Sequence, residues 1–206
     1  MKHVTANTTL LHAQTSDPIA LTRIYNSKVN LAIWDRPLNN LLQAYSRSLC
    51  TSHQQLQIKF CGNLTAIEKH LQLELPDHTA KQDFIDDVVL LVDMFSELFE
   101  MGNVGLRLAV LTKAMCPRFH VDNVPVRLIT TYYGAATEWV DNQHTWRDER
   151  GRVEVSGLAR LQSLQAGQVS LFKGETWIGN KGKGVVHRSP VADTNSPRCV
   201  LTLDCV

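Results

Sequence analysis

Three residues in the second half of the chain have the types and the spacing of a metal-binding site. His120 and Asp122 stand two positions apart, and in an extended chain such residues project to the same side. A third ligand is predicted at His187, which follows a glycine-rich segment. Two imidazoles and one carboxylate on one face leave coordination positions open, as iron(II) requires to bind O₂ together with an organic cosubstrate.

The order of the residues supports this prediction more than the tripeptide His120-Val-Asp122 does. Such a tripeptide arises often by chance, and a lone histidine is more often a satisfied core or surface residue than a ligand. The 65 positions between Asp122 and His187 leave room for several strands that return the chain to the site. Arg198 follows His187 by 11 positions and opens the last predicted strand.

Short strands are predicted for the half of the chain that carries these residues. After Gly102 the apolar pattern has a period of two, with β-branched and aromatic residues bounded by glycine or proline. The segments concerned are 106–111, 126–133, 168–172 and 199–206. Two glycine-rich or polar segments, 141–157 and 174–184, are predicted to be loops, and loops of this kind are also candidates for lids over a site.

The first half of the chain is predicted to be mainly helical. Apolar residues follow helical spacing over 38–49, 64–71 and 79–101. The last of these helices opens on Thr79 and Gln82 in a capping-box pattern, and Gly102 is the expected stop. One strand is expected over 29–34. Helices followed by strands indicate an α+β fold in one domain, with 1–102 as the mainly helical supporting part and 103–206 as the core with the metal site.

Composition excludes several classes of protein. Lys and Arg (21) nearly balance Asp and Glu (20) in the 206 residues, so a nucleic-acid partner is disfavoured. No apolar run reaches the roughly 18–20 residues that a membrane-spanning helix needs. Five cysteines, an odd number without a C-x-x-C pair, argue against a disulfide framework and a thiolate zinc ribbon. A reduced cytoplasmic protein without membrane association is expected.

The chain resembles the iron(II)- and 2-oxoglutarate-dependent dioxygenases, especially their prolyl-hydroxylase-like group. The motif residues His120, Asp122, His187 and Arg198 carry this resemblance, together with the flanking strands, over roughly 104–206. It implies a double-stranded β-helix (a jelly roll, cupin-like) whose outer sheet is covered by the N-terminal helices. More closely, Pro-Arg-Phe-His-Val-Asp at 117–122 and Val-His-Arg-Ser-Pro at 186–190 resemble a bacterial family known only as a domain of unknown function.

The resemblance implies a role for each residue of the site. The two histidines and the aspartate hold iron(II), and 2-oxoglutarate chelates the metal through its keto acid. Arg198 binds the far carboxylate of 2-oxoglutarate in a two-pronged ion pair. Tyr132 or Tyr133, whichever faces inward, donates its hydroxyl to the cosubstrate. The implied activity is hydroxylation or oxidative demethylation of a substrate that the sequence does not identify.

Two other functions stay open at the level of sequence. One is a non-enzymatic or hydrolytic protein of the same fold that holds zinc, for example in metal homeostasis, with Cys116 as a further ligand. The other is an interaction module whose helical half docks a partner. Retention of Arg198 favours the oxygenase, whereas Cys116, four positions before His120, mildly favours zinc. The oligomeric state is not predicted.

Overall fold

Seven strands form the largest sheet of the protein, which is described here by a computed structural model covering residues 11–206. Neighbouring strands are antiparallel except β1 and β2, which are parallel. In spatial order the strands are β1 (Leu11–Thr15), β2 (Val29–Trp34), β10 (Val169–Lys173), β5 (Val126–Tyr133), β12 (Arg198–Cys205), β4 (Val104–Leu111) and β3 (Gln57–Gly62).

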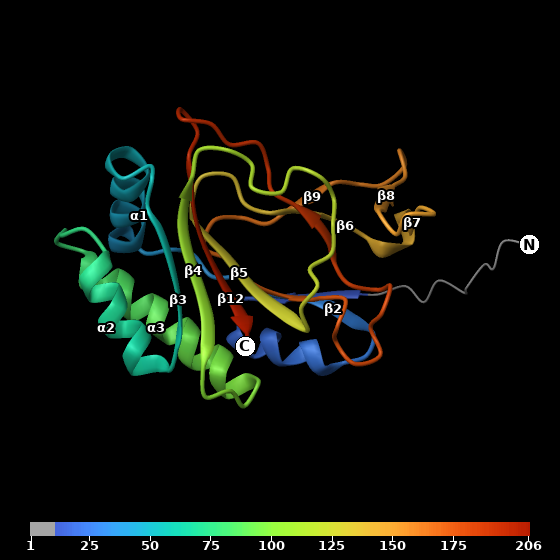
Figure 1. The fold of residues 1–206 in the computed structure, drawn as a ribbon, viewed down its shortest axis with the longest axis horizontal. Coiled ribbons are helices and arrows are strands. Elements are labelled where there is room, and N and C mark those ends of the chain that lie inside the picture. The colour runs from blue at the N-terminus through green and yellow to red at the C-terminus, as the bar shows by residue number, and fades with distance from the viewer. Residues whose placement is uncertain (1–10) are drawn as a thin grey trace, which may run out of the picture.

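A smaller antiparallel sheet faces part of the large one (Figure 1). It consists of β11 (Val186–Arg188), β6 (Glu138–Val140) and β9 (Gln162–Ser163). A separate hairpin, β7 (Thr145–Arg147) and β8 (Val153–Val155), follows the short 3-10 helix η2 (Asn142–His144). Buried side chains from both sheets, among them Ile129, Trp139 and Val200, form a common core. Apolar side chains therefore fill the space between the two sheets, as in a β-sandwich.

Helices cover the opposite face of the large sheet (Figure 1). They are the 3-10 helix η1 (Pro18–Tyr25) and the helices α1 (Asn40–Ser52), α2 (Leu64–Glu74) and α3 (Lys81–Leu98). Asn39 and Asn63 cap α1 and α2 by accepting hydrogen bonds of 2.9 Å from backbone N–H groups of the first turn. None of the helices within residues 11–206 has the length and apolarity needed to cross a membrane.

The strands next to the site bury alternate residues on the two faces of the sheet, as a period of two requires. On β4, Leu106 and Leu108 pack against the helices, whereas Ala109 packs toward the small sheet. On β12, Leu201 faces the helices and Val200 faces the small sheet. The side chains of β4, β5 and β12 that face the small sheet also line a cavity.

Two predictions for the first half need correction. The strand over 29–34 is present as β2, but two strands of the first half were not predicted, β1 and β3, and both join the large sheet. Edge strand β3 buries few residues, and its apolar alternation is accordingly weak. It packs on α2 through a stack of Phe60 on His70, with ring centroids 4.2 Å apart.

The predicted capping box at the start of α3 is also wrong. The N-cap is Ala80, which has no side-chain hydrogen bond to give. The side chain of Gln82 instead hydrogen-bonds to Gln72 of α2 and to Asp86 of its own helix. At the start of the helix, the N–H of Ala80 donates instead to Nδ1 of His78 over 3.0 Å.

Candidate metal centre

A single β-bridge places His120 and His187 side by side. The two residues exchange both backbone hydrogen bonds at 3.0 Å, which makes them directly opposite each other in an antiparallel pair. Their side chains project to the same face, and the ring centroids are 4.5 Å apart. His187 belongs to β11, so the segment around His120 extends the edge of the small sheet.

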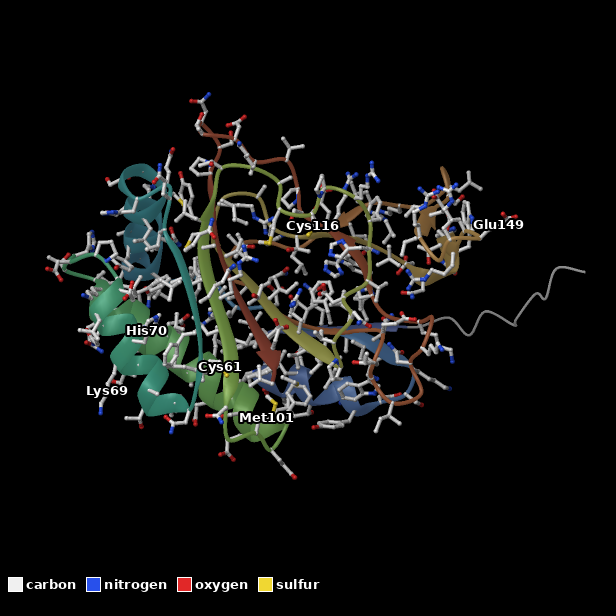
Figure 2. The ribbon with its side chains drawn as sticks, in the orientation of Figure 1. Cys61, Lys69, His70, Met101, Cys116 and Glu149 are labelled. Carbon is white, nitrogen blue, oxygen red and sulfur yellow. The ribbon has the colours of Figure 1, made fainter. Side chains whose placement is uncertain are left out.

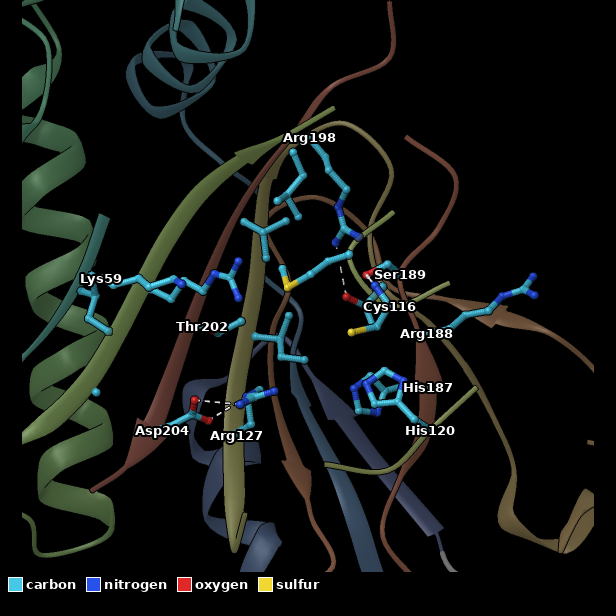
Figure 3. Close-up of a pocket in the computed structure, with 18 of the residues that line it drawn as sticks. Lys59, Cys116, His120, Arg127, His187, Arg188, Ser189, Arg198, Thr202 and Asp204 are labelled. Carbon is cyan, nitrogen blue, oxygen red and sulfur yellow. Dashed lines mark hydrogen bonds and ion pairs between the residues drawn. The ribbon is translucent and has the colours of Figure 1, made fainter. Parts of the chain in front are cut away.

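Asp122 completes a cluster of three metal-ligating side chains. One ligand atom from each of His120, Asp122 and His187 lies within 4.8 Å of the others. The carboxylate oxygens of Asp122 are 3.7 Å from Nε2 of His120 and 3.4 Å from Nε2 of His187. Figure 3 shows the two imidazoles together at one side of a cavity. The structure thus brings together the three residues that the sequence suggested as ligands.

Backbone carbonyl groups orient both imidazoles toward the aspartate. Nδ1 of His120 lies 3.0 Å from the carbonyl of Arg118, and Nδ1 of His187 lies 3.0 Å from the carbonyl of Val185. A carbonyl oxygen only accepts hydrogen bonds, so in each ring Nδ1 is the donor. Each neutral ring therefore presents the lone pair of Nε2 to the cluster, as a metal ligand must.

The charge states of the side chains also suit a metal. Burial, followed by the neighbouring His187, lowers the pKa of His120 and favours its neutral form. Burial alone raises the pKa of Asp122, but the adjacent His187 and the charge of Arg127 outweigh burial, so the pKa is below its usual value. A neutral imidazole and an ionised carboxylate are the forms that bind divalent cations.

One oxygen of Asp122 is held and the other lacks a partner. Arg127 donates from Nη1 to Oδ1 over 2.8 Å, and its Nε and Nη2 donate to Asp204 over 2.7 and 2.8 Å. Oδ2 is buried and accepts no hydrogen bond from the described residues. A buried carboxylate oxygen without a partner is unfavourable, and a cation between the imidazoles would compensate it. The donor set therefore fits a divalent metal.

Two glycines let the segment after β10 pack beneath the loop that carries the aspartate. A Cβ on Gly174 would lie 2.7 Å from the carbonyl oxygen of Asp122, and one on Gly184 would collide with the side chain of Val121. Asn142 holds the end of this segment by donating to the carbonyl of Gly184 over 2.9 Å. The segment 174–184 lines no part of the cavity. In this structure the segment supports the ligand loop, and its role as a lid stays a prediction.

A cavity of about 550 Å³ opens beside the two histidines and also reaches Arg198. Arg198 is 2 % exposed, and its guanidinium has no carboxylate partner among residues 11–206. Its Nη2 donates two long hydrogen bonds, of 3.3 and 3.4 Å, to the hydroxyls of Thr131 and Thr137, and its Nε is buried without an acceptor. Burial lowers the pKa of Arg198 to about 10, so the group stays charged at neutral pH.

The tyrosines predicted to contact a cosubstrate do not reach this cavity. Tyr132 is buried against the helices, and its hydroxyl donates to Asp87 of α3 over 2.6 Å. Tyr133 packs on the same side, beside Arg47 of α1. Tyr132 faces the helices by the ordinary alternation of side chains along β5. The same alternation would turn Tyr133 toward the cavity, but a β-bulge, at which the pairing with β12 skips Tyr132, re-aims it. The prediction for both tyrosines is therefore wrong.

Two further residues lie near the ligands but do not belong to the cluster of three. Cys116 lines the cavity but is not part of the three-residue cluster, so the structure does not place it as a fourth ligand. Arg188 pairs with Glu138 over 2.6 Å and lies over the ring of Phe119. Sequence reasoning missed Arg127, although its position on β5, two residues before the cavity-facing Ile129 and so on the same face, was a usable signal.

Comparison with known proteins assigns the chain to a family. The model of the family described as "Protein of unknown function (DUF1826)" matches residues 15–204. The chain belongs to the DUF1826 family. This agrees with the closer of the two resemblances seen in the sequence. No curated protein matches the chain.

Solved structures show that the DUF1826 chain shares the jelly-roll fold of dioxygenases. The rice dioxygenase for auxin oxidation is 11% identical, with 95% of this chain and 82% of that chain covered and a TM-score of 0.55. The Arabidopsis thaliana enzyme in complex with 2-oxoglutarate is 8% identical, with 95% and 91% covered and a TM-score of 0.54. A full-length Neurospora crassa protein in complex with alpha-KG and 5-formyluracil is 12% identical, with 98% and 86% covered and a TM-score of 0.53. The resemblance of fold is thereby confirmed.

Proposed function

We propose that this protein is an iron(II)- and 2-oxoglutarate-dependent oxygenase of the hydroxylase or demethylase type. His120, Asp122 and His187 are the metal ligands in this proposal, and Arg198 is the anchor of 2-oxoglutarate. As part of the same proposal, the fold is a double-stranded β-helix whose outer sheet carries the helical layer. The similarity to dioxygenases, including two proteins whose structures hold 2-oxoglutarate or alpha-KG, supports the assignment.

The single observation that carries the proposal is the state of Arg198. An arginine that is 2 % exposed, with no carboxylate partner for its guanidinium, is unfavourable unless a ligand supplies the negative charge. Arg198 shares its cavity with both histidines. A dicarboxylic keto acid has one end that chelates a metal and a second carboxylate for a guanidinium, so it satisfies both groups.

Each residue of the site has a task in this function. When bound, iron(II) and 2-oxoglutarate supply the activation of O₂ for oxidation of a C–H bond. Arg127 holds Oδ1 of Asp122, so that Oδ2 remains available as a ligand atom. The hydroxyls of Thr131 and Thr137 orient the guanidinium of Arg198. The buried position of Arg198 also keeps competing water away from its ion pair.

An anaerobic titration tests the proposal. Iron(II) is added to the metal-free protein, followed by 2-oxoglutarate, and the weak visible charge-transfer band of a chelated keto acid is recorded. The band is expected in the wild type and lost in Arg198→Met, with iron(II) binding retained. His120→Ala is expected to lose metal binding while keeping its fold, as judged by circular dichroism.

The alternative is a zinc-holding protein without oxygenase activity. Tight zinc binding, no charge-transfer band with iron(II) and no O₂-dependent conversion of 2-oxoglutarate to succinate would decide for it. A fully occupied metal site in His120→Ala would show that the ligand set is wrong. Since Cys116 lies outside the three-residue cluster, the structure adds no support to a four-ligand zinc site.

A further inference from the structure

The wall of the cavity formed by β3, β4 and β12 carries a row of polar side chains. Lys59 of β3 pairs directly with Arg107 of β4, and Arg107 pairs on its other side with Thr202 of β12. Directly paired residues lie on the same face of a sheet, and all three line the cavity that holds the two histidines. Figure 3 shows Lys59 and the two imidazoles at opposite sides of the cavity, with Thr202 between them.

The two cations of this row have no acidic partner within residues 11–206. Neither Lys59 nor Arg107 forms an ion pair there, and the buried Nε of Arg107 has no hydrogen-bond acceptor. Residues 1–10 contain no aspartate or glutamate. Like charges directly opposite each other destabilise a sheet, and a buried polar atom without a partner calls for an explanation.

Other cations around the site are neutralised by the protein itself. Arg127 pairs with Asp204, and Arg188 pairs with Glu138. Asp204, two positions after Thr202 on β12, has both carboxylate oxygens engaged by Arg127. The unneutralised charge is therefore concentrated on the wall that Lys59 and Arg107 form, apart from the proposed anchor at Arg198.

We propose that the substrate of this protein is a small molecule with a carboxylate or phosphate group, which binds between Lys59, Arg107 and Thr202. That the bound molecule is the substrate rests on the oxygenase function proposed above. The guanidinium offers paired donors to such a group, the ammonium adds charge, and the threonine hydroxyl adds a donor. A cavity of about 550 Å³ is of the size that accepts small molecules, which favours a small molecule over a macromolecule.

Binding of simple anions to the full-length protein tests the subsite. Inorganic phosphate and butyrate are titrated separately at constant ionic strength with sodium chloride, and the Nε–H signal of Arg107 is followed by NMR. We expect a saturable shift of this signal for at least one probe. The probe that binds more tightly indicates whether the anionic group of the substrate is a phosphate or a carboxylate. Affinity is expected to fall about tenfold or more in Arg107→Gln and Lys59→Gln; in the Arg107 variant it is measured by calorimetry.

Two control variants separate this subsite from other sources of anion binding. Lys69→Gln removes one charge from the exposed face of α2 (Figure 2) and is expected to leave the affinity unchanged. Arg198→Met is expected to retain the shift at Arg107. A shift that does not saturate, an affinity that Arg107→Gln leaves unchanged, or a shift lost in Arg198→Met would overturn the subsite.

Stability provides a further test, because the variants should not harm the fold. Removal of one of two opposed like charges is expected to leave the Tm of the unliganded protein unchanged or higher in Lys59→Gln and Arg107→Gln. A lower Tm in both variants would show that the pair is held by protein contacts, against the proposal.

The charge-transfer band distinguishes a failure of the subsite from a failure of the oxygenase function. We expect Arg107→Gln to keep the band with iron(II) and 2-oxoglutarate. A band in the wild type without anion binding at Arg107 would overturn the subsite alone. Anion binding at Arg107 without a band would support an anion-binding site and overturn the identification of its ligand as an oxygenase substrate.

Discussion

Replacing Arg198 with methionine is expected to stabilise the unliganded protein while weakening its binding of 2-oxoglutarate. Burial lowers the pKa of Arg198 well below its ordinary value, to about 10, and one pH unit corresponds to about 1.4 kcal/mol. Keeping this charge inside the protein therefore costs roughly 3 kcal/mol. The folded-state pKa is below the unfolded-state value, so this loss of stability is fully present at neutral pH and diminishes only as pH rises above about 10.

The stability gained by Arg198→Met is smaller than the cost of the buried charge that it removes. The two hydrogen bonds to Thr131 and Thr137 are long, at 3.3 and 3.4 Å, and their removal offsets a part of it. Methionine keeps much of the apolar volume of the arginine side chain. We therefore expect Arg198→Met to raise the free energy of unfolding by about 1–2 kcal/mol. Loss of a two-pronged ion pair is expected to weaken 2-oxoglutarate binding about a hundredfold.

Equilibrium urea denaturation of the metal-free protein measures the free energy of unfolding. Titration of the charge-transfer band measures the affinity for 2-oxoglutarate. Arg198→Lys is the matched control, because it keeps a buried charge and loses the planar fork. It is expected to bring no stabilisation and still to bind 2-oxoglutarate weakly. Destabilisation by more than about 1 kcal/mol in Arg198→Met would refute the reasoning, since the guanidinium would then be satisfied by the protein.

Three other substitutions test the parts of the structure that support the site. Asp87→Ala leaves a buried arginine and a buried tyrosine hydroxyl without their partner, so a loss of about 3–5 kcal/mol is expected in urea denaturation, against less than about 0.5 kcal/mol for the exposed Asp86→Ala. Arg127→Gln is expected to weaken metal binding about 10- to 100-fold by calorimetry, and an unchanged affinity would remove its positioning role. Gly174→Ala is expected to displace the ligand loop and reduce metal occupancy, whereas Gly157→Ala, which meets no neighbouring atom within 4 Å, is the control that should retain it.

Local patterns in the sequence predicted those features that depend on neighbouring residues. The period of two over 126–133 and the helical stripe over 38–49 correspond to β5 and α1. The spacing of His120 and Asp122 indicated two side chains on one side, and the cluster contains both. It is a β-bridge to His187, however, that brings the third side chain beside them, and the sequence supplied only its order and separation.

The sequence by itself determined which residues alternate, where the helices run, and which side chains have the chemistry for a metal and a carboxylate. Tertiary structure decided which of them meet. Lys59 and Arg107 are 48 positions apart and oppose each other only because β3 pairs with β4 in one register. A one-residue bulge turned Tyr133 away from the cavity and toward the helices. Strand register and bulges arise from contacts between distant segments, and periodicity within one segment carries no information about them.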